Sequence, residues 1–171
     1  MVQNKTLTYL AHPSEKIIPG EHIGIKDNTF DTEQAPPQGG ITIKIHYVSF
    51  DPYQRGRMRP SHIKSYTPAF ELNSAITNGG IATVLKSDNN KFKAGDQICS
   101  LFQTPTAEYA ALPKEVADTA NVINNPYKLD PKLFLGPLGM PGLTAYSSFY
   151  DIGAPKKGET IFISSAAGPV G

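Results

Sequence analysis

The last eight residues of the chain, SSAAGPVG, carry the small side chains that a phosphate-binding turn requires. They follow a short apolar run, Thr160–Ile163, and Ala166, Gly168 and Gly171 occupy the positions of a G-x-G-x-x-G pattern. A strand, such a turn and then a helix direct backbone N–H groups at the pyrophosphate of a dinucleotide. Turns of small residues after strands are also common without a ligand, so this pattern needs support from the preceding residues.

A second group of candidate residues lies in the segment DPYQRGRM, which follows an alternating apolar stretch. The hydroxyl of Tyr53 can donate a hydrogen bond to a developing oxyanion, or it can simply cap a loop. Arg55 and Arg57 can clamp a carboxylate or phosphate, but we favour the interpretation that they hold their own loop to carbonyl or acidic groups. Met58 is either an adaptable apolar wall or a core residue.

Composition limits the class of protein that carries these residues. Apolar residues make up 39% and charged residues 18% of the 171 positions, and the net charge is +1. These values are typical of a globular protein, and they argue against nucleic acid or anionic lipid as partners. The single cysteine, Cys99, excludes an internal disulfide. No apolar stretch reaches 18 residues and no signal-peptide core is present, so we expect a cytoplasmic protein without a membrane partner.

The segments that must position Tyr53 and its neighbours, within residues 1–125, are predicted to be mainly strands. In the range 41–47, Ile41, Ile43, Ile45 and Tyr47 alternate with polar residues, which predicts a half-buried strand. Short strands and many Gly and Pro turns predict a small, partly open β barrel over residues 1–125. The other expected strands lie at 5–10, 81–85, 97–102 and 108–112.

The pattern changes after Asn124–Tyr127, which we interpret as a domain boundary. A helix is expected to begin at Pro131–Leu135, and a second one has Pro141 in its first turn and Gly153 as its stop. The order is then a helix, a loop, an apolar strand at Thr160–Ile163 and a turn of small residues. This order predicts that residues 126–171 are the beginning of a parallel α/β sheet.

Three blocks resemble a known family. Tyr47–Met58 (YVSFDPYQRGRM) is similar to its Y-L-S-x-D-P-Y-M-R-G-R-M block, Gly139–Ser164 to its G-x-P-G-L-T-A-Y helix and following strand, and SAAGPVG to its cofactor loop. The family is the zinc-independent medium-chain dehydrogenase/reductases, in the branch of prostaglandin reductases, leukotriene B4 12-hydroxydehydrogenase and alkenal double-bond reductases. The resemblance implies an α/β protein, with a GroES-like β barrel followed by the beginning of a Rossmann-type doubly wound domain.

The resemblance also implies an activity, which is NADPH-dependent reduction of the C=C bond of α,β-unsaturated ketones and aldehydes. Hydride adds to the β-carbon, and Tyr53 is the expected catalytic donor to the enolate. Relatives hold a second tyrosine in a later part of the chain, and a homodimer is expected at full length. The substrate residues would be Tyr53, Met58, Leu101 and Phe102, and the cofactor residues Met140, Thr144, Gly168, Pro169, Val170 and Gly171.

No metal site is expected. Zinc-dependent relatives carry Cys and His ligands where this chain has Val48–Asp51 and Ala69–Glu71. Its four histidines, His12, His22, His46 and His62, lack ligand spacing and are interpreted as surface or loop residues. We interpret Cys99 as a small core residue.

Two alternatives remain open at this point. Quinone reductases share the cofactor loop but generally lack the D-P-Y-x-R-G-R-M block, which favours the enone interpretation. Because the chain stops inside the cofactor loop, we expect the front half of an enzyme that is inactive alone. A truncated, non-enzymatic binding or scaffold piece is the alternative from another class. The chain also has no Trp where relatives often carry one before the last barrel strand, which leaves the substrate undetermined.

Overall fold

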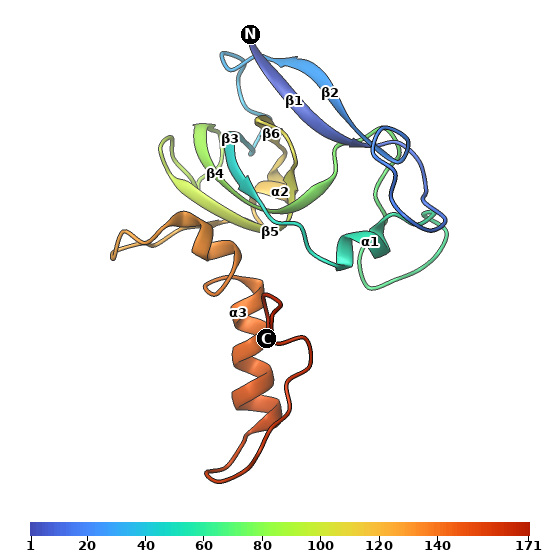
Figure 1. Ribbon diagram of the computed structural model, residues 1–171. Coiled ribbons are helices and arrows are strands. Elements are labelled where there is room, and N and C mark those ends of the chain that lie inside the picture. Colours follow the sequence, from blue (N-terminus) through green and yellow to red (C-terminus); the bar gives the residue numbers. More distant parts are fainter. The chain divides into compact units, whose positions relative to one another are not determined.

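The computed structural model describes residues 1–171 and divides into two compact units, Met1–Asn124 and Asn125–Gly171 (Figure 1). The first unit is built from antiparallel strands and two short helices. Its elements are β1 (Val2–Tyr9), β2 (Ile23–Phe30), β3 (Ile41–Val48), α1 (Tyr53–Arg57), β4 (Thr77–Ser87), β5 (Gln97–Pro105), β6 (Tyr109–Leu112), α2 (Lys114–Ala117) and β7 (Asn121–Val122).

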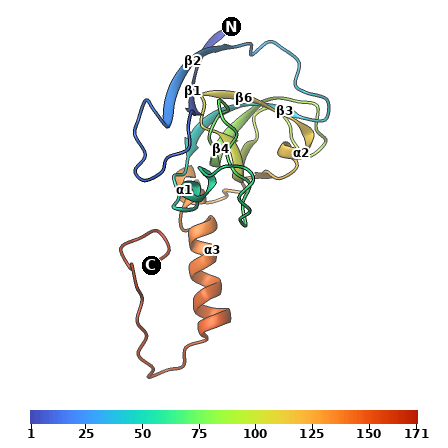
Figure 2. The same ribbon diagram turned by 90° about the vertical axis from the view of Figure 1, so that its right-hand side faces the viewer.

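Five strands form one sheet in the order β6-β3-β4-β5-β7, while β1 and β2 pair with each other. Single bridges from Thr6 to Ala107 and from Thr8 to Ala75 join β1 to the rest of the unit. The strands curve as expected for a GroES-like fold, but they do not close into a barrel. In both ribbon views α1 lies at the end of this unit opposite the N-terminus (Figures 1 and 2).

Two apolar clusters form the core of the first unit. The larger one lies between the five-stranded sheet and α2; it contains Ile41, Ile43, Ala82, Val84, Phe92, Ile98, Ala110, Leu112, Ala117 and Ala120. The smaller one contains Tyr9, Met58, Phe70 and Ile76. This second cluster supports the residues around α1, because Met58 follows α1 directly and the Tyr9 hydroxyl donates to the Met58 carbonyl at 2.8 Å.

The expected alternation in β3 fails at its end. Ile41 and Ile43 are buried, but Tyr47 is 41% exposed. The pairing of β3 with β4 shifts between Ile45 and Tyr47, and such a bulge turns the following side chains to the other face. Tyr47 therefore does not share the core face, contrary to the prediction.

Strand β4 also begins earlier than expected, so that Gly79 and Gly80 lie inside it. A Cβ at Gly80 would lie 2.5 Å from the Cγ2 atom of Thr104, and one at Gly79 would lie 3.0 Å from the Leu101 carbonyl oxygen. These glycines allow β4 and β5 to approach closely.

The second unit contains η1 (Pro131–Leu135), a 3₁₀ turn, then α3 (Met140–Tyr146), which continues as the π-helical segment η2 (Ser147–Gly153). Pro141 lies in the first turn of α3 as predicted. The helical segment ends at Gly153, but the left-handed residue after it is Ala154, with φ of 41°, rather than the glycine.

Thr160–Ile163 does not form the predicted strand. A parallel strand is stabilised by hydrogen bonds to neighbouring strands, and the second unit contains no other strand to supply them. No helix of the structure combines the length and the apolar character needed to cross a membrane.

Candidate functional site

Helix α1 is held at the ends of β3 and β4 by the side chain of Gln54, which is 6% exposed. Its amide nitrogen donates to the Ser49 carbonyl at 3.2 Å and to Oδ1 of Asn78. Its amide oxygen accepts from the Asp51 N–H at 3.1 Å. A five-residue helix has little stability of its own, so these contacts fix the orientation of the residue before Gln54, which is Tyr53.

The Tyr53 hydroxyl is buried and has no hydrogen-bond partner. The ring packs edge-on against Phe102, with centroids 5.5 Å apart. Burial raises the pKa of Tyr53, with smaller contributions from Asp51 and Tyr66, while the positive charge of Arg57 opposes this rise. The phenol therefore keeps its proton at neutral pH, and that proton is directed at no acceptor of the chain.

Arg57 lies one helical turn after Tyr53 and is 9% exposed. Its Nε donates to the Pro68 carbonyl at 3.0 Å, and its two terminal nitrogens donate to the carbonyl and hydroxyl oxygens of Thr77 at 2.9 and 3.0 Å. The guanidinium also lies over the Phe70 ring, 4.1 Å from its centroid. Arg57 thus fastens the segment 68–77 to α1.

Arg55 and Arg59 hold two further loops in the same way. Arg55 donates to the carbonyls of Pro13 and Glu15 at 3.2 and 2.9 Å. Arg59 donates to the carbonyls of Gly56, Ile63 and Thr67. Arg55 and Arg57 bond to carbonyl groups, as the favoured interpretation expects, but these groups belong to other segments of the chain rather than to their own loop. Arg59 is the arginine that bonds within its own loop.

One pocket of the first unit, with a volume of about 710 Å³, is bordered by α1, the segment 66–77 and β5. Arg57, Tyr66 and Phe102 are among its lining residues, together with Thr77 and Gln103. Phe102, one of the lining residues, touches the Tyr53 ring, although Tyr53 itself does not line the pocket. An apolar wall with a few polar groups is typical of small-molecule sites.

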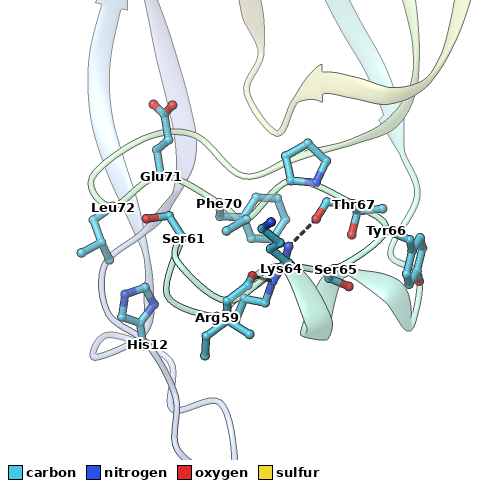
Figure 3. Close-up of a pocket in the computed structure, with 13 residues that line it drawn as sticks. His12, Arg59, Ser61, Lys64, Ser65, Tyr66, Thr67, Phe70, Glu71 and Leu72 are labelled. Atoms are coloured by element: carbon cyan, nitrogen blue, oxygen red, sulfur yellow. Dashed lines mark hydrogen bonds between the residues drawn. The ribbon is translucent and has the colours of Figure 1, made fainter.

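A second pocket, of about 820 Å³, is lined largely by residues of the loop 59–72 (Figure 3). Figure 3 shows Arg59 reaching across this loop to Thr67, with Phe70 beside it and His12 entering from the β1–β2 connection. Tyr66 and Thr67 line both pockets, so this loop forms the wall between them.

The structure brings together only part of the predicted substrate set. Phe102 joins Tyr53, although it is 40% exposed, and the neighbouring Leu101 is exposed and absent from the pocket lining. Met58 is buried against Tyr9, Phe70 and Ile76, which favours its packing role. The sequence analysis missed Arg59 and Tyr66. The only signal for them was their residue types and their position near the prolines of a loop.

The predicted cofactor residues all lie in the second unit. The Thr144 hydroxyl donates to the Met140 carbonyl at 2.8 Å inside α3. The Gly168 N–H donates to the Ser165 carbonyl at 2.9 Å, which curls the terminal loop. A Cβ at Gly171 would lie 2.6 Å from the Cα of Ala166, so this turn is tight where the pattern places glycine. Pro169 and Val170 lie between the two glycines.

No group of three or more His, Cys, Asp or Glu side chains could hold a metal ion. His22 is buried in the turn before β2, where its Nδ1 accepts from the Ile18 N–H at 2.9 Å, so it is a loop residue but not a surface residue. Cys99 is half-buried on β5, and burial raises the pKa of its thiol.

Comparison with known proteins agrees with this architecture. Residues 24–117, more than half of the chain, match the model of a family described as the N-terminal domain of oxidoreductase. The chain belongs to this oxidoreductase family. The match covers β2 to α2 and therefore the whole segment from α1 to the loop 59–72, which confirms the resemblance to the medium-chain dehydrogenase/reductases.

Individual relatives of this family extend the match to the end of the chain. NADP-dependent oxidoreductase RED1 of Cochliobolus heterostrophus is 46% identical over 171 residues, which are 100% of this chain and 48% of that protein. The 2-alkenal reductase (NADP(+)-dependent) of Nicotiana tabacum is 38% identical over 148 residues, 86% of this chain and 41% of that protein. The chain thus spans about half the length of these relatives.

A solved structure, CurA from Vibrio vulnificus, superposes with a TM-score of 0.80 and 28% identity, over 98% of this chain and 46% of that one. A structure of the same protein in complex with NADPH gives a TM-score of 0.76 at 26% identity, over 97% of this chain and 46% of that one. These similarities confirm the expected fold class of the oxidoreductase family.

Proposed function

We propose that this chain forms the substrate side of an NADP-dependent oxidoreductase that reduces the C=C bond of α,β-unsaturated ketones and aldehydes. One observation carries this proposal: the buried Tyr53 hydroxyl has no acceptor, and the Tyr53 ring contacts Phe102, which lines a pocket of about 710 Å³. Leaving a buried donor unpaired is costly, so a ligand oxygen is the natural acceptor. The names of the Nicotiana relative and of RED1 support both the substrate class and the cofactor.

In this proposal NADPH supplies the hydride that adds to the β-carbon of the enone. The carbonyl oxygen then gains negative charge, and the Tyr53 hydroxyl donates a hydrogen bond to it. The donor is protonated at neutral pH because burial raises the pKa of Tyr53. The α-carbon takes its proton from water. A preorganised donor stabilises the transition state more than the ground state, because the charge on oxygen grows during the reaction.

The terminal loop is the proposed phosphate-binding part of the site. The curl between Ser165 and Gly168 and the close approach of Gly171 to Ala166 leave no room for larger side chains. Such a turn suits backbone contact with a pyrophosphate. We assign Gly168 to Gly171 to the phosphates and Met140 and Thr144 to the nicotinamide side. Residues 1–125 and 126–171 would then be the substrate domain and the start of the dinucleotide-binding domain.

The proposal places the active protein in the cytoplasm as a homodimer. The proposed reaction stabilises its developing charge by hydrogen bonds alone. Activity is accordingly expected to persist in the presence of a chelator.

The decisive experiment uses a polypeptide that carries these 171 residues at the full length of the family. Tyr53→Phe should lower kcat for a 2-alkenone about tenfold to a hundredfold, which is less than the roughly 10²–10³ of a sole donor because relatives supply a second tyrosine. The KM for NADPH should stay unchanged. Tyr109→Phe is the matched control, since its ring stacks on Phe30 outside both pockets.

Unchanged turnover in Tyr53→Phe would return this residue to a packing role. A kcat/KM that is higher for quinones than for any enone would favour the quinone reductase alternative. The 171-residue chain alone is expected not to oxidise NADPH with an enone, because hydride transfer needs both reactants held in register. NADPH consumption by a verified 171-residue product would contradict this expectation.

A further inference from the structure

Arg57 is a buried cation without a counter-charge. It is 9% exposed, and its three hydrogen bonds end on neutral oxygens, those of Pro68 and Thr77. None of the ion pairs of the structure includes it. Burial is the main cause that lowers the pKa of Arg57, yet a guanidinium keeps its proton throughout the physiological range.

A buried, uncompensated charge destabilises a fold unless it serves another purpose. The contact over the Phe70 ring offsets only a small part of the cost of burying a charge. Neutral donors could fasten the segment 68–77 to α1 at a lower desolvation cost. The positive charge itself therefore calls for an explanation beyond loop fastening.

The position of Arg57 relative to Tyr53 supplies that explanation. The two residues are four positions apart on α1, so their side chains leave the same face of the helix. Phe102 touches the Tyr53 ring and lines the same pocket as Arg57. The charged and titratable groups that act on Tyr53 are Asp51 before α1, Arg57 on α1 and Tyr66 on the following loop. Arg57 is the one cation among them.

We propose that Arg57 is a positioning residue that acts through Tyr53: its uncompensated charge stabilises the negative charge that develops on the oxygen bound to the Tyr53 hydroxyl. This inference rests on the proposed function, in which Tyr53 is the donor. Arg57 also fixes the wall 68–77, so the electrostatic role must be separated from the mechanical one. Arg57→Lys keeps the charge and loses the planar set of guanidinium donors, whereas Arg57→Gln keeps a hydrogen-bond donor and loses the charge.

The first test follows the phenol itself and needs no activity. The 171-residue chain is labelled with ¹³Cζ-tyrosine, and the Tyr53 signal is assigned by its loss in Tyr53→Phe. We expect Arg57→Gln to move the Tyr53 titration upward, because the only cation that lowers the pKa of Tyr53 is gone. Arg57→Lys should titrate close to the wild type. Arg55→Gln is the matched control: it removes a guanidinium of the same helix that contacts Pro13 and Glu15 instead.

The inference is overturned if the Tyr53 titration of folded Arg57→Gln equals that of the wild type, or if Arg55→Gln moves it equally. Far-UV circular dichroism checks the fold of each variant. Should Arg57→Gln fail to fold, Arg57→Met replaces it, since its unbranched side chain can still pack on Phe70.

The second test measures turnover at full family length. Arg57→Gln should lower kcat about tenfold with the KM for NADPH unchanged, and Arg57→Lys should retain most of the wild-type kcat. Equal losses in both variants would mean that Arg57 acts only by fastening the loop, and would overturn the inference. If Tyr53→Phe has no effect while the titration still responds to Arg57, the proposed function fails instead, so the two failures are distinguishable.

Discussion

Replacing Gln54 with alanine tests whether a single buried amide holds α1, and hence Tyr53, in place. Gln54 makes three hydrogen bonds, to the Ser49 carbonyl, the Asp51 N–H and Oδ1 of Asn78. Ser49 and Asp51 are partly exposed, so water can replace the amide at both. Asn78 is 0% exposed, and its Oδ1 would lose its donor inside the protein.

These contacts set the expected magnitude. Each intramolecular hydrogen bond contributes about 1 kcal/mol net, and a buried acceptor left unpaired costs about 1–3 kcal/mol. Since water offsets two of the three lost bonds in part, Gln54→Ala should lower the free energy of unfolding by about 2–4 kcal/mol. For a unit of this size the midpoint of thermal unfolding should fall by roughly 8–16 °C.

The assay is urea unfolding of the 171-residue chain, followed by far-UV circular dichroism because the chain contains no Trp. Gln34→Ala is the matched control, since Gln34 is exposed in the loop between β2 and β3. A loss below about 1 kcal/mol, or one equal to that of Gln34→Ala, would refute the view that Gln54 anchors α1.

The remaining predictions concern the two units and their response to acid. In hydrogen exchange, the amides of residues 155–171 should exchange at least about tenfold faster than those of β3 and β4, because few of them are hydrogen-bonded; equal protection would contradict this. The pKa of Asp118 is lowered first by the hydrogen bond from Lys114 and then by that from Asn89. Its stabilisation is therefore complete above the unfolded value of about 3.9 and is lost as the pH falls through the folded value. The urea midpoints of the wild type and Asp118→Asn should differ at pH 7, and the difference should shrink as the pH falls below about 3.9; a constant difference would argue against this pair.

Much of the first unit could be predicted because the local pattern and the long-range packing agree there. Ile41 and Ile43 alternate with polar residues, and the structure buries both against the β4 strand. β2 could not be predicted in the same way. Its sequence, IGIKDNTF, is mostly polar, and it forms because β1 pairs with it along its whole length. Edge strands of this kind carry little periodic signal.

Only part of the candidate site could be predicted from the sequence. Tyr53 could be selected from its motif, but the packing of its ring against Phe102, which is distant in the chain, and the lack of a partner for its hydroxyl could not. Helix α1 is too short to show a helical period. Arg59 and Tyr66 lie in a loop whose conformation is set by bonds from side chains to carbonyl groups, and such bonds follow no spacing rule.

The second unit shows the opposite situation, a local pattern without its long-range partners. Thr160–Ile163 has the composition of a buried strand, yet the structure leaves it irregular, and Phe162 is 93% exposed. Composition determines which residues suit a parallel sheet, whereas hydrogen bonds from neighbouring strands determine whether they form it. The helix α3, whose bonds are internal, forms as predicted in its first turn.

Arg59 closes the loop 60–67 by hydrogen bonds to backbone carbonyl groups. Its base is fixed by one side chain on Gly56, Ile63 and Thr67, and none of these bonds involves a strand of the sheet. We therefore expect that varying residues 60–66 while retaining Arg59 leaves the strand register unchanged. Libraries of this kind would test the proposed substrate range, because Tyr66 in this segment lines both pockets.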